Sequence, residues 1–408
     1  MNTYFYRRAG AEAHALDLAE QLRRRGHEVR FFAMQHPDNL ESADAPYWVP
    51  EIDYRSMNAA KNPVNGVRVL TRAIYSFGAR DALARMLADW RPEVAHLHSL
   101  HAHLTPSVID ALRSADVPIV WTLHDCKLLC PNTTFLSHDQ LCERCKGSRF
   151  WECTLRRCKK DSFSASLVAT LEAEAHRFLR IPAHVNRFIA PSEFLRQKFV
   201  EFGWPADKIV QMPNFNSWPL VASVEMPAER RILYSGQLTR PKGIMTLLEA
   251  ARHLPGASLD IAGEGILRPE IESLLADQNP GGADVTLHGR VGADVLQRLA
   301  DSARLVVVPS EGYENSPYSV IEAFARARPV VASRLGGLPE LVVDEVNGIT
   351  VDPGSAEQIA QATARILDDA RLWARLADGA LCTAAARSAS EYVVNLELLY
   401  SDLIQRTA

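Results

Sequence analysis

The chain has 408 residues, 47% of them apolar, and a formal net charge of −4. This length exceeds what one hydrophobic core usually spans, and the weakly acidic balance speaks against a nucleic-acid-binding protein. No apolar stretch reaches membrane-spanning length, and Met1 to Gly10 lacks the apolar core of a signal peptide. We therefore expect a two-domain enzyme of the cytoplasm.

The first half alternates short β-branched segments with helical periodicity, which is typical of parallel sheets with crossover helices. A helix is expected before Gly26, and strands at 29–33, 94–98, 119–123 and 188–190. Met1 to Tyr6 is short for a first strand, which is normally central, so we expect unpaired ladder groups on its neighbours. We hypothesise that the native chain starts upstream of Met1. Gly10 still allows a tight turn after this segment.

Histidines follow two of the expected strands. His124 and Asp125 come directly after 119–123, and a neutral imidazole beside a carboxylate can orient a hydroxyl group near neutral pH. The alternative is a histidine that backbone groups satisfy at a strand end. A second group follows the strand at 94–98 and lacks acids at ligand spacing, so we expect no catalytic metal there. Its members are His96, His98, His101 and His103, with His98 a candidate for an acceptor-binding role.

Six of the seven cysteines lie in an insert that spans residues 126–160. Four thiolates can close a tetrahedral zinc site, and a cytoplasmic chain does not rely on disulfides, so we hypothesise a structural zinc ion. Disulfides and buried thiols are the alternatives. The candidate ligands are Cys130, Cys142, Cys145, Cys153 and Cys158.

The same insert is basic, with eight lysines and arginines against three acids. Such a surplus is compatible with peripheral contact with anionic lipid at the inner face of the membrane, or with an anionic acceptor. A solvated basic face is the more usual interpretation of a run of charges.

Residues 212–227 show neither periodicity and contain three prolines, so we place the domain boundary there. The expected domains are 1–214 and 215–385, followed by a C-terminal helix at 386–408. Strands of the second domain are expected at 232–235, 259–262, 285–288, 305–308 and 330–333.

The first three of these strands end in loops that contain glycine and candidate site residues. The first loop begins at Gly236 and carries Arg240 and Lys242, whose charges could neutralise a diphosphate leaving group; a solvated basic turn is the alternative. The next two loops hold Gly263 and Gly265, and then Arg290 and Val291.

The most informative segment is 305–340. The strand at 305–308 opens into a loop with Glu314, Asn315 and Ser316, and an apolar helix with Glu322 follows. Ser316 before Pro317 predicts a helix N-cap whose free N–H groups attract phosphate. A carboxylate accepts two hydroxyl hydrogen bonds at once, which suits sugar and ribose hydroxyls. We interpret this segment as a site for a sugar nucleotide, against the alternative of a solvated helix residue and a capping acid.

Glu314, Glu322, the strand at 329–333, Gly336-Gly337 and Glu340 occur in the order found in the retaining GT-B glycosyltransferases of family four, which this segment resembles. The resemblance implies an α/β fold of two Rossmann-like, doubly wound parallel-sheet domains that face a cleft. It also implies that the C-terminal helix returns to the first domain.

The resemblance assigns roles to the candidate residues. Glu314 would contact the donor sugar and Glu322 the ribose, the glycines would bring backbone N–H groups to the diphosphate, and the loop at Arg290 would bind the base. His124 would meet the donor phosphates or sugar at the cleft, and Lys242 matches the family lysine. The family arginine after Gly236 is Gln237 here, so Arg240 is its candidate substitute.

The implied reaction moves a sugar from a nucleotide-diphosphate sugar to a hydroxyl of a carbohydrate or lipid-linked acceptor, with retention of configuration, in cell-surface polysaccharide or glycolipid synthesis. The expected catalytic residues are His124, Glu314 and Lys242. No Asp-x-Asp motif follows a strand, so no cofactor is expected for catalysis. The alternatives are a sugar-nucleotide epimerase of the GT-B fold and a sugar-nucleotide-binding protein without catalysis. An oxidoreductase is disfavoured because no complete Gly-x-Gly-x-x-Gly follows a strand.

Overall fold

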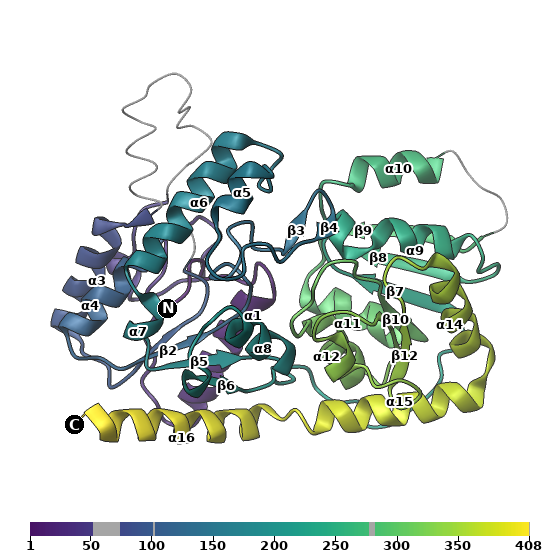
Figure 1. Ribbon diagram of the computed structural model, residues 1–408. Helices are drawn as coiled ribbons and strands as arrows, with labels where there is room; N and C mark the ends of the chain where they lie inside the picture. Colours follow the sequence, from purple (N-terminus) through teal and green to yellow (C-terminus); the bar gives the residue numbers. More distant parts are fainter. Residues whose placement is uncertain (52–73, 101–102, 277–281, 408) are drawn as a thin grey trace. The chain divides into compact units, whose positions relative to one another are not determined.

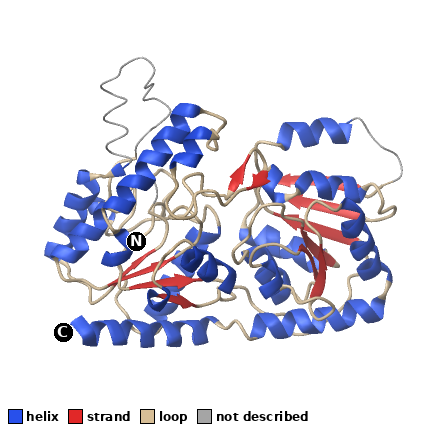
Figure 2. Cartoon of the chain, in the orientation of Figure 1, coloured by secondary structure: helices blue, strands red, loops and turns tan. Residues whose placement is uncertain are grey.

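The computed structural model describes residues 1–51, 74–100, 103–276 and 282–407. The chain divides into two compact units. The first unit comprises Met1–Pro213 and the residues from Ala389 onward, and the second comprises Asn214–Ser388. Figure 2 shows that each unit has strands surrounded by helices.

The first unit is built on a parallel sheet with strand order β1-β2-β5-β6. Strands β2, β5 and β6 are labelled in Figure 1. The strands of the unit are β1 (Ala95–Leu97), β2 (Ile119–Thr122), β5 (Arg187–Ala190), β6 (Ile209–Gln211) and the small antiparallel hairpin of β3 (Leu136–Ser137) and β4 (Gln140–Leu141). Its helices are α1 (Gly10–Arg24), η1 (Ala45–Tyr47), α3 (Phe77–Asp89), α4 (Ser107–Ser114), α5 (Trp151–Leu155), α6 (Phe163–Phe178), α7 (Ile181–His184), α8 (Glu193–Glu201), η2 (Ala206–Lys208) and α16 (Ala389–Thr407).

The expected helix before Gly26 and the expected strands at 94–98, 119–123 and 188–190 are confirmed as α1, β1, β2 and β5. The strand expected at 29–33 is wrong, because the chain forms only an isolated bridge from Met34 to Val49. One physical reason is that the Phe31 N–H donates to a side chain, the Asp44 carboxylate, at 2.8 Å. This N–H group is therefore not available for a hydrogen bond to a neighbouring strand.

The N-terminal residues pair with backbone on both sides. Asn2 N–H donates to Phe32 O and Met34 N–H to Thr3 O, while Thr3 N–H donates to Ser99 O at 2.8 Å. The expectation of unpaired ladder groups beside the short first segment is therefore wrong at these positions. The N-terminal residues thus pair with the backbone groups of the neighbouring segments although they form no regular strand.

The second unit holds a six-stranded parallel sheet with order β12-β11-β10-β7-β8-β9. Its strands are β7 (Arg231–Ser235), β8 (Ser258–Ala262), β9 (Asp284–Gly289), β10 (Leu305–Val308), β11 (Val330–Ser333) and β12 (Gly348–Val351). Counted from β7, this order is the Rossmann order 3-2-1-4-5-6 seen from the other edge. All five strands expected here are confirmed, and β12 was missed.

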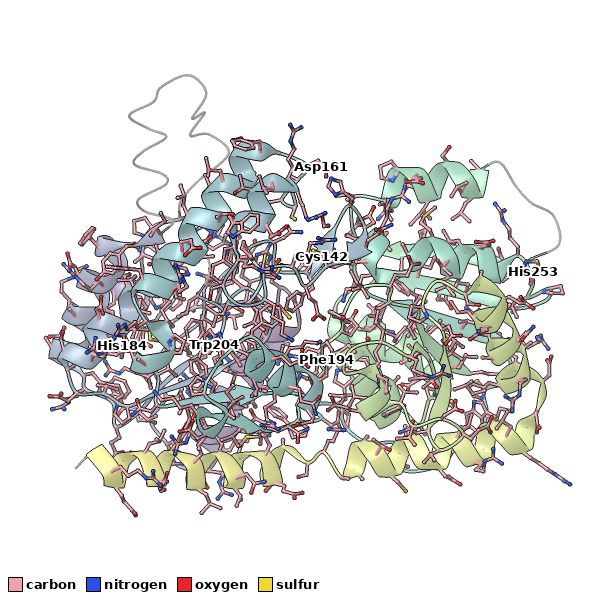
Figure 3. The ribbon with its side chains drawn as sticks, in the orientation of Figure 1. Cys142, Asp161, His184, Phe194, Trp204 and His253 are labelled. Carbon is pink, nitrogen blue, oxygen red and sulfur yellow. The ribbon has the colours of Figure 1, made fainter. Side chains whose placement is uncertain are left out.

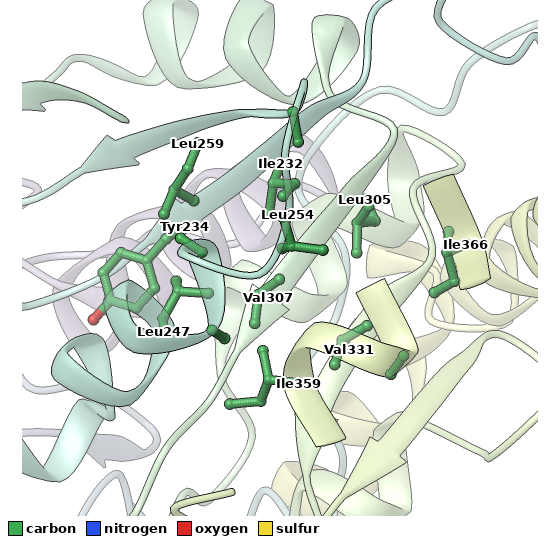
Figure 4. Close-up of a cluster of buried hydrophobic side chains, with 14 of the residues drawn as sticks. Ile232, Tyr234, Leu247, Leu254, Leu259, Leu305, Val307, Val331, Ile359 and Ile366 are labelled. Carbon is green, nitrogen blue, oxygen red and sulfur yellow. The ribbon is translucent and has the colours of Figure 1, made fainter. Parts of the chain in front are cut away.

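Helices cover both faces of this sheet, as in a doubly wound domain. The helices of the unit are η3 (Arg240–Lys242), α9 (Ile244–Ala251), α10 (Arg268–Ala276), α11 (Ala293–Ser302), α12 (Tyr318–Ala325), α13 (Leu338–Leu341), α14 (Ala356–Asp368) and α15 (Ala370–Ala385). One buried cluster joins the sheet to α9 and α14 (Figure 4), and a second joins it to α11, α12 and α13. The expected fold class is confirmed.

The C-terminal helix α16 packs against α1 in the first unit. Arg25 makes two hydrogen bonds of 2.7 Å to the Glu397 carboxylate. Tyr400 OH lies 2.6 Å from His96 Nδ1 on β1. The last helix therefore reaches β1, the edge strand of the first sheet. In the part of the chain that the structure describes, no helix combines the length and hydrophobicity needed to cross a bilayer.

Candidate functional site

The candidate site of the second unit lies where β7 and β10 end side by side. These two strands are parallel neighbours. They mark the point where the strand order reverses, because β8 and β9 continue on one side and β11 and β12 on the other. In open α/β sheets, ligands bind in the crevice outside the carboxyl ends of strands at this switch point.

A partly buried ion pair joins the loops that follow the two strands. Lys242 Nζ lies 2.6 Å from Glu314 Oε1, and the Ser310 hydroxyl donates to the same oxygen at 2.7 Å. The Glu314 side chain is only 11% exposed, whereas that of Lys242 is 35% exposed. Glu311 and Gly312 donate their N–H groups to Pro241 O, which fixes the two loops together. Two of the three expected catalytic residues are thus in contact.

A third loop, after β11, is held against Glu314 by the double glycine. Gly337 N–H donates to Glu314 O at 2.7 Å. Gly336 has a φ of 63°, and a Cβ there would lie 2.4 Å from the same oxygen. The glycines therefore permit close approach of two protein loops. From the sequence, we had assigned these glycines only to the approach of backbone N–H groups to the diphosphate.

Glycines also join the loops after β7 and β8. A Cβ on Gly263 would lie 1.8 Å from Gly236 O, and one on Gly265 would lie 2.2 Å from Leu238 O. Leu238 N–H donates to Glu264 O at 2.9 Å. These positions need glycine for backbone packing, which sets the shape of the site edge.

The other two candidate cations of the second unit lie farther out. The Arg240 side chain is 57% exposed, and its guanidinium lies 3.9 Å from the Glu270 carboxylate. Arg290 is exposed, while Val291 packs against the buried cluster of α11 and α12. The structure therefore brings Lys242, and not Arg240, to Glu314.

The polar residues around α12 are partly enclosed. Glu322 lines a small pocket with Ser235, Ser319 and Trp218. The predicted N-cap at Ser316 is wrong by one residue, because the extended Pro317 caps the helix and α12 begins at Tyr318. Ser316 is buried, and its hydroxyl has no hydrogen-bond partner among the described residues. Asn315, in the same loop, is partly buried.

In the first unit, buried histidines gather around His124. His98 Nδ1 lies 3.0 Å from His124 Nε2, and the two rings stack. His96 stacks on His98, and the His14 ring of α1 lies 5.3 Å from that of His124. A small pocket is lined by His98, His124, Asp125 and Trp121. His101 lies outside the described residues.

The environment holds three of these histidines neutral. Burial, and next the positive charges of neighbouring groups, lower the pKa of His14, His96 and His98 well below the usual value. A neutral imidazole can both donate and accept a hydrogen bond. His14 and the Tyr392 and Tyr400 side chains of α16 were missed by the sequence. In the sequence these residues stand out only by their helical spacing, which indicates a helix packed on the core and not a role in a functional site.

Gly10 is the first residue of α1 and is exposed. The helix start has no side-chain cap, but Ala9 N–H donates to the Glu12 carboxylate at 3.1 Å. The tight turn expected at Gly10 is thus the entry into α1 within the first unit.

The cysteines of the insert lie near one another, and Cys142 (Figure 3) follows β4. Cys145, Cys153 and Cys158 share one apolar cluster with Phe150. The hydrogen bond with the Cys153 thiol lowers the Cys158 pKa, while burial raises the Cys145 pKa to about 12. Within the described residues, no three His, Cys, Asp or Glu side chains surround a common point as metal ligands do.

Comparison with known proteins covers both units. Residues 8–215 match the family model described as Glycosyltransferase Family 4, and residues 229–369 match that of Glycosyl transferases group 1. The chain is similar to an uncharacterized glycosyltransferase of Methanocaldococcus jannaschii, with 27% identity over 88% of this chain and 85% of that protein. It is also similar to an amylovoran biosynthesis glycosyltransferase of Erwinia amylovora, with 30% identity over 58% of this chain and 59% of the other.

Solved structures share the fold. Anabaena HepE, crystallised with UDP and glucose, superposes with a TM-score of 0.67 over 98% of both chains at 17% sequence identity. At this level of identity the likeness concerns the fold.

Proposed function

Because the chain belongs to the glycosyltransferases of the GT-B fold, we propose that it transfers a sugar from a nucleotide-diphosphate donor to an acceptor hydroxyl with retention of configuration. The observation that carries this proposal is the pair of Lys242 and Glu314 at the switch point of the second sheet. A cation and a carboxylate fixed there match the two parts of such a donor, its diphosphate and its sugar hydroxyls.

Lys242 supplies the charge that the leaving group needs. When the bond to the sugar breaks, negative charge grows on the diphosphate, and a fixed ammonium stabilises it. Lys242 is held in place by Glu314, and its η3 turn is tied to the loop after β10 through Pro241. This prior positioning lowers the cost of reorganisation during the reaction.

Glu314 and Glu322 bind hydroxyl groups. Oε1 of Glu314 already accepts from Lys242 and Ser310, and the second carboxylate oxygen is assigned to a donor-sugar hydroxyl. Glu322 lines its pocket beside Ser235 and Ser319, so we assign it to the neighbouring hydroxyls of ribose. Asn315 and Ser316 supply further polar groups in the same loop. Arg240 and Arg290 are assigned to the outer phosphate and to the base.

His124 is the residue of the first unit that we assign to the reaction. Its hydrogen bond with His98 fixes the ring, and the neighbouring rings have pKa values lowered by burial. A ring in this position can orient a hydroxyl of the donor or acceptor. Gly10, at the start of α1, is assigned to binding of the donor near the acceptor.

The acceptor class rests on the relatives. Because the Erwinia relative is named for amylovoran biosynthesis, we propose a carbohydrate or lipid-linked acceptor. UDP-sugars are the first donors to test, since HepE was crystallised with UDP. No metal is assigned to the catalytic step.

The proposal is tested by measuring nucleotide affinity and product formation with a panel of nucleotide sugars. Removing a charge-assisted hydrogen bond costs about 1.5–3 kcal/mol, so Glu322→Gln should bind the donor about 10- to 100-fold more weakly. Glu311→Gln is the matched control, because Glu311 lies in the neighbouring loop and its carboxylate accepts from Thr246 instead. Equal donor affinity in both variants would contradict the assignment.

Two product measurements separate the alternatives. Incubation with donor alone detects an epimerase, because the sugar would change configuration without an acceptor. Nucleotide binding without turnover on any acceptor would identify a binding protein. Formation of a product with retained configuration supports the proposed reaction.

We keep a structural zinc ion in the 126–160 insert as a separate proposal. The thiols of Cys130, Cys142, Cys145, Cys153 and Cys158 influence one another electrostatically, but their side chains would have to turn to make a tetrahedral site. Metal analysis of protein purified without chelator should find one zinc ion per chain. Absence of zinc, together with a melting temperature that chelator does not change, would refute this proposal.

A further inference from the structure

Helix α6 of the first unit turns large apolar side chains outward and buries polar ones, the reverse of an ordinary surface helix. Five of its large exposed side chains are apolar, and Arg177 is also exposed. The apolar five are Phe163, Leu167, Val168, Leu171 and Phe178. Its buried face is mostly polar or small: Ser166, Ala169, Thr170, Glu172, Ala173 and His176. The positions 163, 167, 171 and 178 recur at helical spacing, so they lie along one side of the helix.

The polar face is buried because several of its side chains make specific contacts within its own unit. Thr170 and Thr154 of α5 share a hydrogen bond of 2.8 Å, and Thr170 donates to Phe150 O at 3.0 Å. Glu172 makes a buried ion pair of 2.7 Å with Lys127. These contacts fix the orientation of α6. Because they hold the polar side against the unit, the apolar side faces outward.

Helix α5 adds to this apolar surface. Trp151 is 50% exposed and Leu155 is 69% exposed. Together α5 and α6 hold seven of the eighteen exposed large apolar side chains of the described residues, within 28 positions of the chain. Single exposed apolar residues are ordinary, but a concentration of this kind marks a surface that contacts something apolar.

The charge around this surface selects the partner. Between residues 144 and 180 the chain has nine lysines and arginines against four acids. One of those acids, Glu172, is buried in its pair with Lys127. Arg144, Arg157 and Lys160 are exposed. Asp161, labelled in Figure 3, is the acid between the two helices.

We propose that the outward faces of α5 and α6 form a docking surface for an anionic lipid bilayer. An apolar stripe with exposed aromatic side chains, flanked by arginine and lysine, is the composition of helices that lie in a membrane interface. The apolar side chains enter the acyl boundary, and the cations meet lipid phosphates. With 16 residues, α6 is about 24 Å long and lies along the surface. This inference adds a location to the proposed transfer and does not depend on it.

The test is flotation of the full-length protein with vesicles of phosphatidylcholine, alone or mixed with phosphatidylglycerol. The wild-type protein should float with the mixed vesicles, and added salt should weaken this binding. Leu167→Glu/Leu171→Glu should lower the bound fraction at least tenfold. Arg157→Glu/Lys160→Glu should lower it on the mixed vesicles. Leu398→Glu is the matched control, because Leu398 on α16 is 65% exposed and lies outside the surface.

Three outcomes would overturn the proposal. Wild-type protein that stays unbound with both vesicle types is one, and equal binding by Leu167→Glu/Leu171→Glu is another. The third is a concentration-dependent dimer that the same variant abolishes without any vesicle binding, since the occupant would then be a second copy. Transfer to a water-soluble acceptor, measured without vesicles, reports on the proposed function separately. The melting temperature of each variant checks that it is folded.

Discussion

The two units of the chain differ in how their functional residues are assembled. In the second unit, the candidate residues stand in loops directly after strands, and one sheet brings those strand ends together. In the first unit, His124 contacts the rings of His14 on α1 and of His98, which directly follows β1. Helix α16, at the far end of the chain, adds Tyr392 beside His14 and Tyr400 beside His96. The first kind of site follows from local pattern, whereas the second depends on contacts across hundreds of residues.

The largest expected effect concerns the polar interior that orients α6 in the first unit. Glu172→Ala leaves the Lys127 ammonium, now 6% exposed, without its carboxylate. Breaking a buried pair in this way costs about 3–5 kcal/mol of unfolding free energy. Asp402→Ala, which removes an exposed partner of Arg406 on α16, should cost no more than about 1 kcal/mol. Chemical denaturation measures both, and equal costs would contradict the importance of the pair.

The same pair predicts an acid dependence. Burial raises the pKa of Glu172, but the charges of Lys127 and His176 outweigh it, so the folded-state pKa is lowered. A lowered carboxyl pKa contributes stability above the unfolded value, about 4.3, and this stability is lost as the pH falls through the folded value. The difference in stability between wild type and Glu172→Gln should therefore shrink below pH 4.

The second effect belongs to the donor side. Lys242→Ala removes the cation that we assign to the leaving diphosphate, and such losses lower the rate about 10²- to 10³-fold. Arg240→Ala should have a smaller effect, because its guanidinium lies beside Glu270 and away from Glu314. Steady-state kinetics with a UDP-sugar gives kcat/KM for both. A larger loss in Arg240→Ala would reverse our assignment of the two cations.

The loops of the second unit explain how much the sequence could predict there. Each of its five expected strands is a short run of β-branched or apolar residues. Strands of a parallel sheet that is covered on both faces have such runs whatever their neighbours are, so they can be recognised from the local sequence alone. The order of those strands then places Lys242 beside Glu314. The roles of Gly263 and Gly336 in loop packing could not be predicted, because the carbonyl oxygens that exclude a Cβ come from other loops.

The first unit was harder to predict for the corresponding reason. Residues 29–33 have strand composition, yet Asp44 takes a donor that a strand would need. The inverted face of α6 also has no local signal, because its polar positions are satisfied by Thr154, Phe150 and Lys127. Burial of a polar residue is decided by its distant partners, and sequence periodicity does not contain them.

A third prediction compares two glycines of the second unit. Gly336 and Gly354 both have positive φ, of 63° and 77°, so alanine costs each about 1–2 kcal/mol. Only at Gly336 would the added Cβ also meet a backbone oxygen, Glu314 O at 2.4 Å, whereas a Cβ on Gly354 would enter open space. Gly336→Ala should therefore cost about 1–3 kcal/mol more. Denaturant midpoints measure the difference, and equal costs would show that the loop after β11 can move away from Glu314.

The smallest expected effect tests whether the histidine cluster is held neutral. Burial lowers the folded-state pKa of His98, and the repulsion that a protonated His98 would meet from His96, His124, His14 or the Met1 amino group in their charged forms lowers it further. The unfolded chain therefore binds a proton below about pH 6.5 that the folded chain does not, and stability falls as the pH falls. One such group contributes a slope of at most about 1.4 kcal/mol per pH unit.

His98→Gln removes that contribution, so its stability should fall less steeply than that of the wild type between neutral pH and about pH 5. His253→Gln is the control, because His253 is exposed on the second unit (Figure 3) and should leave the slope unchanged. Glutamine can also keep a hydrogen bond to His124, so His98→Gln should retain more transferase activity than His98→Ala. An unchanged slope in His98→Gln would mean that the folded-state pKa of His98 is not lowered, so that His98 takes up a proton in the folded protein as readily as in the unfolded chain. Once protonated, the His98 ring could only donate to His124, whose own ring would then have to act as the acceptor of that hydrogen bond.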